Sequence, residues 1–224
     1  MGLRIVTLGA PGAGKGTQAK RLATDQGLPH ISTGDIFRAH LREGTDLGKQ
    51  VQSYLDAGRL VPDDVTCAIV ADRLAEPDCA DGYILDGFPR SVPQAEALDA
   101  VLCERGETLD VAINIDVPDD VIVGRLTARR SCPQCGRIYN LTYDPPQRDG
   151  VCDNPDCGGA ALVHRKDDQV ETINERLRVY HETTEPIIAY YDRQGILSNV
   201  LAADAPPPDV YKKIEEALAA LESS

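Results

Sequence analysis

The sequence predicts an α/β fold in which a parallel sheet is covered on both faces by helices. Short apolar segments of strand length alternate along the chain with longer segments of helical periodicity. The segment 111–117 is apolar along most of its length rather than alternating between apolar and polar residues, as strands covered on both faces are. A glycine-rich loop at 9–17 joins the first predicted strand to the first predicted helix. With 224 residues, the chain can form one core domain that carries small insertions.

The loop at 9–17 has the pattern of a phosphate-binding loop. Gly9, Gly14 and Lys15 match G-x-x-x-x-G-K, in which backbone N–H groups surround a polyphosphate and the lysine reaches its outer oxygens. The predicted helix 15–26 adds the partial positive charge of its N-terminus. Gly16 stands where Ser or Thr is usual, and the hydroxyl follows at Thr17. The alternative is a glycine-rich turn that binds nothing.

The next part of the chain predicts a small helical flap at about 32–61, inserted between two core strands. A short extended segment leads to a helix that opens near Asp35, where Thr33 and Asp35 are candidate helix caps. A second helix is predicted at about 46–56, and a third runs from Pro62 to Leu74.

A short buried strand at 83–86 ends in the carboxylate of Asp86, and Arg90 follows soon after. Ligands of open α/β sheets bind beyond the carboxyl ends of the strands, so both side chains are expected at the site. Further elements are predicted as a helix at 91–104, a strand at 111–117, a helix from Pro118 that carries Arg125, Arg129 and Arg130 toward its end, a long polar helix at 168–191, a strand at 196–202 and a helix at 207–221.

Between about 131 and 166 helical periodicity disappears, and Cys, Pro, Gly and Asp become frequent. Cys132 and Cys135 precede a second pair, Cys152 and Cys157, at a separation typical of a four-thiolate zinc site. Four protein ligands leave no open position, so such a site is structural. The alternatives are Asp153, Asp156 or His164 as a ligand, or four free thiols without a metal.

Composition excludes several classes of protein. The net charge of −13 opposes binding along nucleic acid, which requires a basic face. Arginine outnumbers lysine by 17 to 6, which suits a small, highly anionic ligand. No apolar run spans a bilayer, and no secretion segment is recognised, so we expect a cytoplasmic protein with reduced thiols. Cys67, Cys79 and Cys103 are interpreted as ordinary small apolar residues. No large exposed apolar face is suggested, so a monomer is expected.

Four motifs in order carry a resemblance to a known family. They are the loop at 9–17, the segment STGDIFR at 32–38, the segment DGFPR at 86–90 followed by Gln94, and RKDD at 165–168 followed by Arg176. Across nearly its full length the chain resembles adenylate kinases of the long, lid-bearing type, and its insert is similar to the zinc-binding lid of many bacterial members.

This resemblance implies reversible phosphoryl transfer from Mg-ATP to AMP, giving two ADP. It also implies a P-loop fold with a five-stranded parallel sheet and two mobile covers. The implied domains are a core at 1–31, 62–127 and 167–224, an NMP-binding flap at 32–61 and a lid with the four cysteines at 128–166. The lysine that some members place near the ATP base has no match near Asn199.

The resemblance also implies the following site residues. The ATP site would comprise Gly12, Ala13, Gly14, Lys15, Gly16, Thr17, Arg129, Ile138 and Tyr139. The AMP site would comprise Thr33, Arg38, Arg59, Leu60, Val61, Gly87, Phe88, Pro89, Arg90, Gln94, Arg165 and Arg176, with Gln94 reading the adenine edge. The catalytic cations would be Lys15, Arg90, Arg129, Arg165 and Arg176. Asp86 would hold Mg²⁺ through water, and the four cysteines would hold structural zinc.

Three other functions remain open from the sequence. A kinase for UMP, CMP or GMP would differ in its base contacts, for which Thr33 and Gln94 are the deciding positions. A nucleotide-dependent switch protein would lack a second nucleotide site, whereas Arg38 and Arg90 favour one. A zinc ribbon that binds nucleic acid is opposed by the acidic balance and by the aromatic content of 4%.

Overall fold

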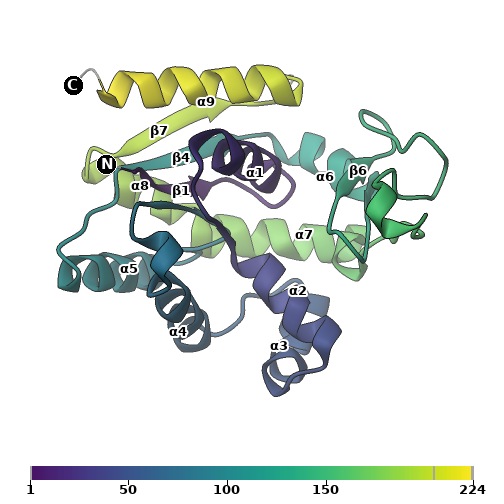
Figure 1. Ribbon diagram of the computed structural model, residues 1–224, viewed down its shortest axis with the longest axis horizontal. Helices are drawn as coiled ribbons and strands as arrows, with labels where there is room; N and C mark the ends of the chain where they lie inside the picture. Colours follow the sequence, from purple (N-terminus) through teal and green to yellow (C-terminus); the bar gives the residue numbers. More distant parts are fainter. Residues whose placement is uncertain (1, 204, 223–224) are drawn as a thin grey trace.

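The computed structural model describes residues 2–203 and 205–222, which form a central sheet with helices on both faces (Figure 1). Within these residues the sheet has five strands in the order β2-β3-β1-β4-β7, and all neighbouring pairs are parallel. The strands are β1 (Arg4–Leu8), β2 (His30–Ser32), β3 (Tyr83–Asp86), β4 (Val111–Asp116) and β7 (Leu197–Leu201). The predicted α/β class and the five-stranded sheet are therefore confirmed.

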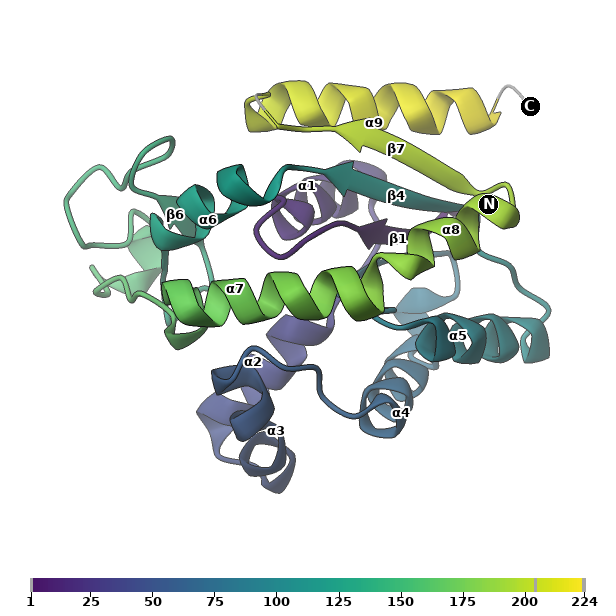
Figure 2. The same ribbon diagram turned by 180° about the vertical axis from the view of Figure 1, so that it is seen from behind.

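Alternate side chains of each strand enter two apolar clusters on opposite faces of the sheet. In β1, Ile5 packs in a cluster with Leu22 and Tyr211, whereas Val6 packs in a cluster with Leu98 and Tyr191. The first cluster includes α1 (Lys15–Gln26) and α9 (Pro207–Glu222), and the second includes α5 (Val92–Glu104) and α8 (Pro186–Arg193) (Figures 1 and 2). Burial on both faces explains why these strands are so apolar.

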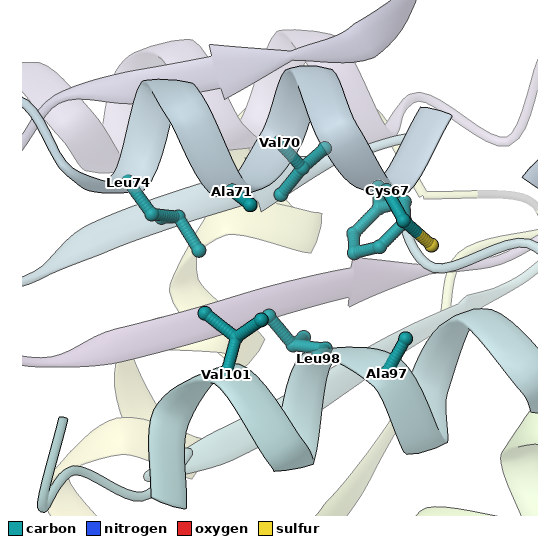
Figure 3. A pocket seen from close by; sticks show the side chains of 8 residues that line it. Cys67, Val70, Ala71, Leu74, Ala97, Leu98 and Val101 are labelled. Carbon is teal, nitrogen blue, oxygen red and sulfur yellow. The ribbon is translucent and has the colours of Figure 1, made fainter. Parts of the chain in front are cut away.

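A small apolar cavity of about 30 Å³ lies between α4 (Asp63–Leu74) and α5. Figure 3 shows Leu74 and Val70 of α4 facing Val101 and Leu98 of α5 across it. Phe88 also lines the cavity, which therefore lies directly behind the loop that follows β3. Its size and apolar lining suit a packing defect rather than a ligand site.

Residues from about 32 to 61 form a helical pair with its own small core. The helices are α2 (Thr33–Glu43) and α3 (Asp46–Asp56), and Phe37 of α2 and Val51 of α3 pack together with Val61. Ser32 caps α2 by accepting a hydrogen bond from the Asp35 backbone N–H. The predicted caps, Thr33 and Asp35, instead lie inside the helix, and the Thr33 hydroxyl donates to Gly87 O at 2.8 Å.

The cysteine-containing insert follows α6 (Asp119–Thr127) and begins with an antiparallel pair, β5 (Arg129–Ser131) and β6 (Ile138–Asn140). The prediction that Arg129 and Arg130 belong to the preceding helix is wrong, because the helix ends at Thr127 and both residues lie in β5. The insert has its own core of cysteines and Tyr139, separate from the cores on the sheet.

The predicted long helix at 168–191 is interrupted. It consists of α7 (Val170–Val179), a π-helical turn at Tyr180–Thr184 and α8, which begins at Pro186. Such turns occur frequently at functional sites. Here the turn directs the Thr184 hydroxyl to the backbone carbonyl of Arg90 at 2.8 Å. Across the described ranges, every helix is too short or too polar to cross a membrane.

Candidate active site

The candidate site is a cleft of about 1170 Å³ at the carboxyl ends of the strands. It lies where the glycine-rich loop, the loop after β3, the helical pair and the cysteine-containing insert meet. Most of the residues expected at the site line it, namely Gly12, Ala13, Gly14, Lys15, Gly16, Thr17, Arg38, Leu60, Asp86, Gly87, Pro89, Arg90, Arg129, Ile138, Tyr139, Arg165 and Arg176.

The remaining expected residues do not line the cleft. Thr33, Val61, Phe88 and Gln94 are buried under the loops that form the wall of the cleft. Arg59 is exposed, and its guanidinium lies over the Tyr54 ring, 5.4 Å from the ring centroid. The Arg59 side chain therefore does not join the other arginines in the cleft.

The glycine-rich loop has backbone geometry that requires glycine. Gly9, Gly12 and Gly14 have φ values of 132°, 88° and 102°, a region that side chains rarely adopt. A Cβ on Gly16 would lie 3.1 Å from Asp86 Oδ2, a tight contact that a small shift of the Asp86 side chain would have to relieve. The loop thus brings the N-terminus of α1 against the carboxylate at the end of β3.

Lys15 lines the cleft and is half-buried. Its Nζ donates to the carbonyls of Gly9 and Ala10 at 2.7 and 2.9 Å. Burial lowers the pKa of Lys15 to about 8; Asp86 opposes this shift, while Arg90, Arg176 and Arg129 add to it. A bound polyanion would relieve this crowding of positive charge.

Asp86 is the acidic group beside Lys15. Its Oδ2 lies 3.4 Å from Nε2 of His30, which is long for a hydrogen bond, and that nitrogen has no hydrogen-bond partner among the described residues. Burial alone would raise the pKa of Asp86, but His30, Lys15 and Arg90 outweigh it and hold the pKa below its usual value. Asp86 therefore stays ionised, as a ligand for a hard cation must.

The arginines of the cleft lie close enough to affect one another. Burial, and then the charge of Arg176, lowers the pKa of Arg90 to about 10. Burial, followed by Arg129 and Arg38, lowers the pKa of Arg165 to about 10. Even so, all of them remain cationic near neutral pH. Their concentration in one cleft creates a strongly positive site within a chain of net charge −13.

Carboxylates hold the arginines in place. Asp168 is fully buried and accepts two hydrogen bonds from Arg129, at 2.6 and 2.8 Å, and one from Arg176 at 3.3 Å. Asp167 pairs with Arg176 at 3.0 Å. On the opposite wall, Asp35 accepts from Arg38 at 2.6 Å. The guanidinium groups therefore have defined positions.

Sequence reasoning missed two residues of this region. The sequence pattern assigns Arg125 to a helix and to no site, but Arg125 donates to Ala13 O in the glycine-rich loop and to Ala202 O and Ala203 O after β7. Asp63 was counted only as part of a helix, but it accepts from Gln94 at 2.6 Å. Neither residue differs in sequence from an ordinary charge on a helix.

The four cysteines of the insert come together as predicted. Their Sγ atoms all lie within 4.8 Å of one another, and the Cys132–Cys157 and Cys135–Cys152 separations are both 3.7 Å. A tetrahedron of thiolates with zinc–sulfur bonds of about 2.3 Å has edges of about 3.8 Å, so the four sulfurs fit this metal. In the described part of the chain, neither Asp153, Asp156 nor His164 belongs to this cluster.

Tyr139 connects this cluster with the cleft. Its hydroxyl accepts from the Asp153 backbone N–H at 2.7 Å and donates to Cys152 Sγ at 3.4 Å. Its neighbour Ile138 lines the cleft on the same strand. The segment Ile138–Tyr139, which the resemblance places along ATP, is therefore hydrogen-bonded to Cys152, a candidate metal ligand.

A phosphate-binding loop at the carboxyl edge of a parallel sheet, faced by half-buried arginines, defines a P-loop nucleotide-binding protein with the site of a phosphotransferase. The adenylate kinase family model matches residues 7–196. The chain is 54% identical over 198 residues to an adenylate kinase of Agathobacter rectalis, covering 88% of this chain and 91% of that protein. It is 51% identical over 218 residues to one of Symbiobacterium thermophilum, covering 97% and 99%.

A third similar protein is an adenylate kinase of Methanothrix thermoacetophila, 52% identical over 201 residues, with 90% of this chain and 92% of that protein covered. The chain therefore belongs to the adenylate kinase family, and it is a nucleoside monophosphate kinase. The family and the enzyme class implied by the four sequence motifs are confirmed.

Proposed function

We propose that the cleft binds Mg-ATP and AMP together and transfers a phosphoryl group between them, with two ADP as products. The observation that carries this proposal is the convergence of Lys15 with Arg90, Arg129 and Arg176 on one cleft, close enough for the arginines to contribute to the lowered pKa of Lys15. A single nucleotide requires fewer cations. Two facing phosphate chains require charge compensation along their whole length.

ATP would bind along the glycine-rich loop. The backbone N–H groups from Gly12 to Thr17 and the N-terminus of α1 would surround its phosphates, with Lys15 on the outer oxygens. Ile138 and Tyr139 would lie along the base from the insert. This placement is supported by their positions in the cleft wall.

AMP would bind between the helical pair and the loop after β3. Arg38 and Arg90 would hold its phosphate, and the main chain of 59–61 and 87–89 would surround the nucleoside. Gln94 would contact the adenine edge, and Thr33 fixes the loop through its bond to Gly87 O at 2.8 Å. The exposed Arg59 side chain has no part in this arrangement.

Transfer would occur between the two sites, with Arg129, Arg165 and Arg176 around the phosphate in flight. An AMP phosphate is already anionic, so no general base is needed and none is assigned. The residues contribute alignment and charge compensation, which account for most of the catalysis in this type of reaction. Mg²⁺ supplies further charge compensation on the phosphate oxygens, and Asp86 would hold it through water.

We further propose that the chain has a core at 1–31, 62–127 and 167–224, an NMP-binding flap at 32–61 and a lid at 128–166. The two covers approach each other, since Arg42 of the flap donates to Pro133 O of the lid at 3.4 Å. Closure would exclude water, which competes with AMP as phosphoryl acceptor.

The four cysteines of the lid would hold structural zinc. Four reduced thiols suit the cytoplasm, and because one chain lines the whole cleft, a monomer suffices for activity.

The test is ADP formation from Mg-ATP with AMP, UMP, CMP or GMP in turn, for the wild type and for Arg90→Ala. Of the four monophosphates, we expect only AMP to support rapid turnover with Mg-ATP. In Arg90→Ala we expect the rate of ADP formation to fall at least about a hundredfold. Equal turnover with UMP or CMP would assign a different acceptor. ATP consumption that is independent of any monophosphate would contradict phosphoryl transfer to a second nucleotide.

A further inference from the structure

The Gln94 side chain is held from two sides by groups of opposite hydrogen-bonding character. Its Oε1 accepts from the backbone N–H of Arg90 at 2.8 Å, and its Nε2 donates to Oδ1 of Asp63 at 2.6 Å. Gln94 lies in the first turn of α5 and is 1% exposed, whereas Asp63 is the first residue of α4. Two helices and the loop after β3 therefore meet at one amide.

Both partners are themselves held in place. The second carboxylate oxygen of Asp63 accepts from the Ser91 hydroxyl at 2.8 Å. The carbonyl of Arg90 accepts from Thr184 in the π-helical turn, also at 2.8 Å. Neither the Asp63 carboxylate nor the Arg90 backbone can turn away from the Gln94 amide without breaking another bond.

Only one orientation of the amide satisfies these neighbours. A backbone N–H only donates and a carboxylate only accepts, so Oε1 must face Arg90 and Nε2 must face Asp63. Rotating the amide by half a turn would place NH₂ against N–H and carbonyl oxygen against carboxylate. Both contacts would then be repulsive, and both buried groups would lose their partners.

The fixed orientation determines what Gln94 offers to a ligand. Within the described residues its amide makes no other hydrogen bond, so one N–H and one oxygen lone pair remain. Adenine presents an amino donor at C6 beside a ring-nitrogen acceptor. These two groups complement the remaining oxygen lone pair and the remaining N–H of Gln94. Hypoxanthine and guanine present a carbonyl acceptor beside an N–H donor, which matches only the rotated amide.

We propose that Asp63 is a specificity-determining positioning residue that makes Gln94 select a 6-aminopurine over a 6-oxopurine. The inference rests on the proposed contact between Gln94 and the base of AMP. Asp63 acts through Gln94 and touches neither nucleotide. Its role is to exclude the amide orientation that a 6-oxopurine requires, which is how a polar site discriminates strongly between near-isosteric ligands.

The experiment compares kcat/KM for AMP with kcat/KM for inosine monophosphate, which differs in the 6-position and the adjoining ring nitrogen. Asp63→Ala removes the acceptor, and Asp63→Leu removes it while keeping a branched side chain with the same number of heavy atoms, so a folding defect in one variant does not decide the test. Asp63→Asn also removes the negative charge, but its amide oxygen can still accept from Gln94. The NH₂ group of the new asparagine can donate to the Ser91 hydroxyl. Asp64→Ala changes the next residue of the same helix, which is exposed.

We expect the AMP-to-IMP ratio to fall at least about tenfold in Asp63→Ala and Asp63→Leu. In Asp63→Asn it should return to within about threefold of the wild type, and Asp64→Ala should not change it. A purely structural role would reduce both kcat/KM values together and leave the ratio unchanged.

Gln94→Ala separates this inference from the function on which it rests. If Gln94→Ala loses the discrimination while both acceptor-free variants at position 63 keep it, Asp63 has no role in specificity and the proposal is overturned. If Gln94→Ala also keeps the discrimination between AMP and IMP, the base contact assigned to Gln94 is wrong. The inference about Asp63 then fails together with that contact. Absence of AMP-dependent turnover in the wild type would instead contradict the proposed function.

Discussion

Arg129 and Asp168 form a two-point ion pair beneath the cleft, with Nε and one terminal nitrogen of the arginine 2.8 and 2.6 Å from the two carboxylate oxygens. Asp168 is fully buried and lies just before α7, whereas Arg129 begins the insert. The pair therefore connects the base of the proposed lid to the core. It also fixes the plane of a guanidinium that we place on the transferred phosphate.

Asp168→Asn should damage both stability and catalysis. The amide keeps the shape but offers one acceptor and turns NH₂ toward Arg129, leaving its charge poorly compensated. We expect the free energy of unfolding to fall by about 2–3 kcal/mol, less than the ~3–5 kcal/mol of a fully buried pair because Arg129 keeps some solvent contact. We also expect kcat to fall at least about tenfold. Urea titration and steady-state kinetics measure the two effects.

Glu175→Gln is the matched control for this change, because it removes the charge of one partly exposed partner of Arg178 on α7. It should alter neither the melting temperature nor kcat measurably. A wild-type kcat in Asp168→Asn would contradict the idea that the ion pair positions Arg129 for catalysis.

Binding of ATP should take up a proton at Lys15. The pKa of Lys15 is about 8 in the free protein, so Lys15 is neutral in a substantial fraction of the molecules at that pH. The phosphates favour the charged form and raise this pKa, so binding consumes protons and weakens as pH rises through about 8. Calorimetry between about pH 8 and 9 in buffers of different ionisation enthalpy measures the uptake, at a pH where phosphate itself no longer titrates.

Lys15→Arg is the informative comparison for proton uptake. It retains a cation whose pKa is far above this range, so its uptake should vanish. Equal uptake in the wild type and in Lys15→Arg would assign the titrating group elsewhere in the site.

The order of the core elements could be predicted because each apolar strand is bounded by a clear signal. Gly14, Ser91 and Pro118 stand at the starts of helices in the sequence and in the structure. Less was predictable where the signal is weak. The helix before the insert ends at Thr127, and its C-cap is Ala128, a good helix former, so nothing in the sequence separated Arg129 from the helix.

The site was predictable to the extent that its residues lie in local motifs. The glycine-rich loop and the arginines of the four segments could be named without coordinates. Arg125 and Asp63 could not, because their importance depends on partners 77 and 31 residues away in the chain. The π-helical turn could not be predicted either, because its sequence continues the helical pattern of the residues before it.

Removal of the lid metal should lower stability more than activity. The proposed zinc, held by four thiolates, would stabilise a segment that otherwise has only a small core of its own. We expect Cys157→Ala to lose bound zinc and at least about 5 °C in melting temperature, while kcat at 25 °C stays within about threefold of the wild type. Cys103→Ala, at an exposed cysteine outside the cluster, should retain the metal and the melting temperature.

Metal analysis, thermal unfolding and kinetics together decide this prediction. Loss of turnover at a temperature where the metal-free fold persists would show that the metal contributes to catalysis. It would then act through the segment at Ile138 and Tyr139, whose hydroxyl contacts Cys152.

Leu98→Ala should be unusually costly because it enlarges a cavity that already exists. Leu98 is 2% exposed and lines the 30 Å³ space between α4 and α5 (Figure 3). The volume lost would join this space, so we expect the free energy of unfolding to fall by about 4–5 kcal/mol, the upper part of the usual range. Leu201 is 66% exposed, so Leu201→Ala should change the free energy of unfolding by less than about 0.5 kcal/mol. Urea unfolding at 25 °C measures both, and a loss below about 2 kcal/mol in Leu98→Ala would mean that the two helices close over the gap.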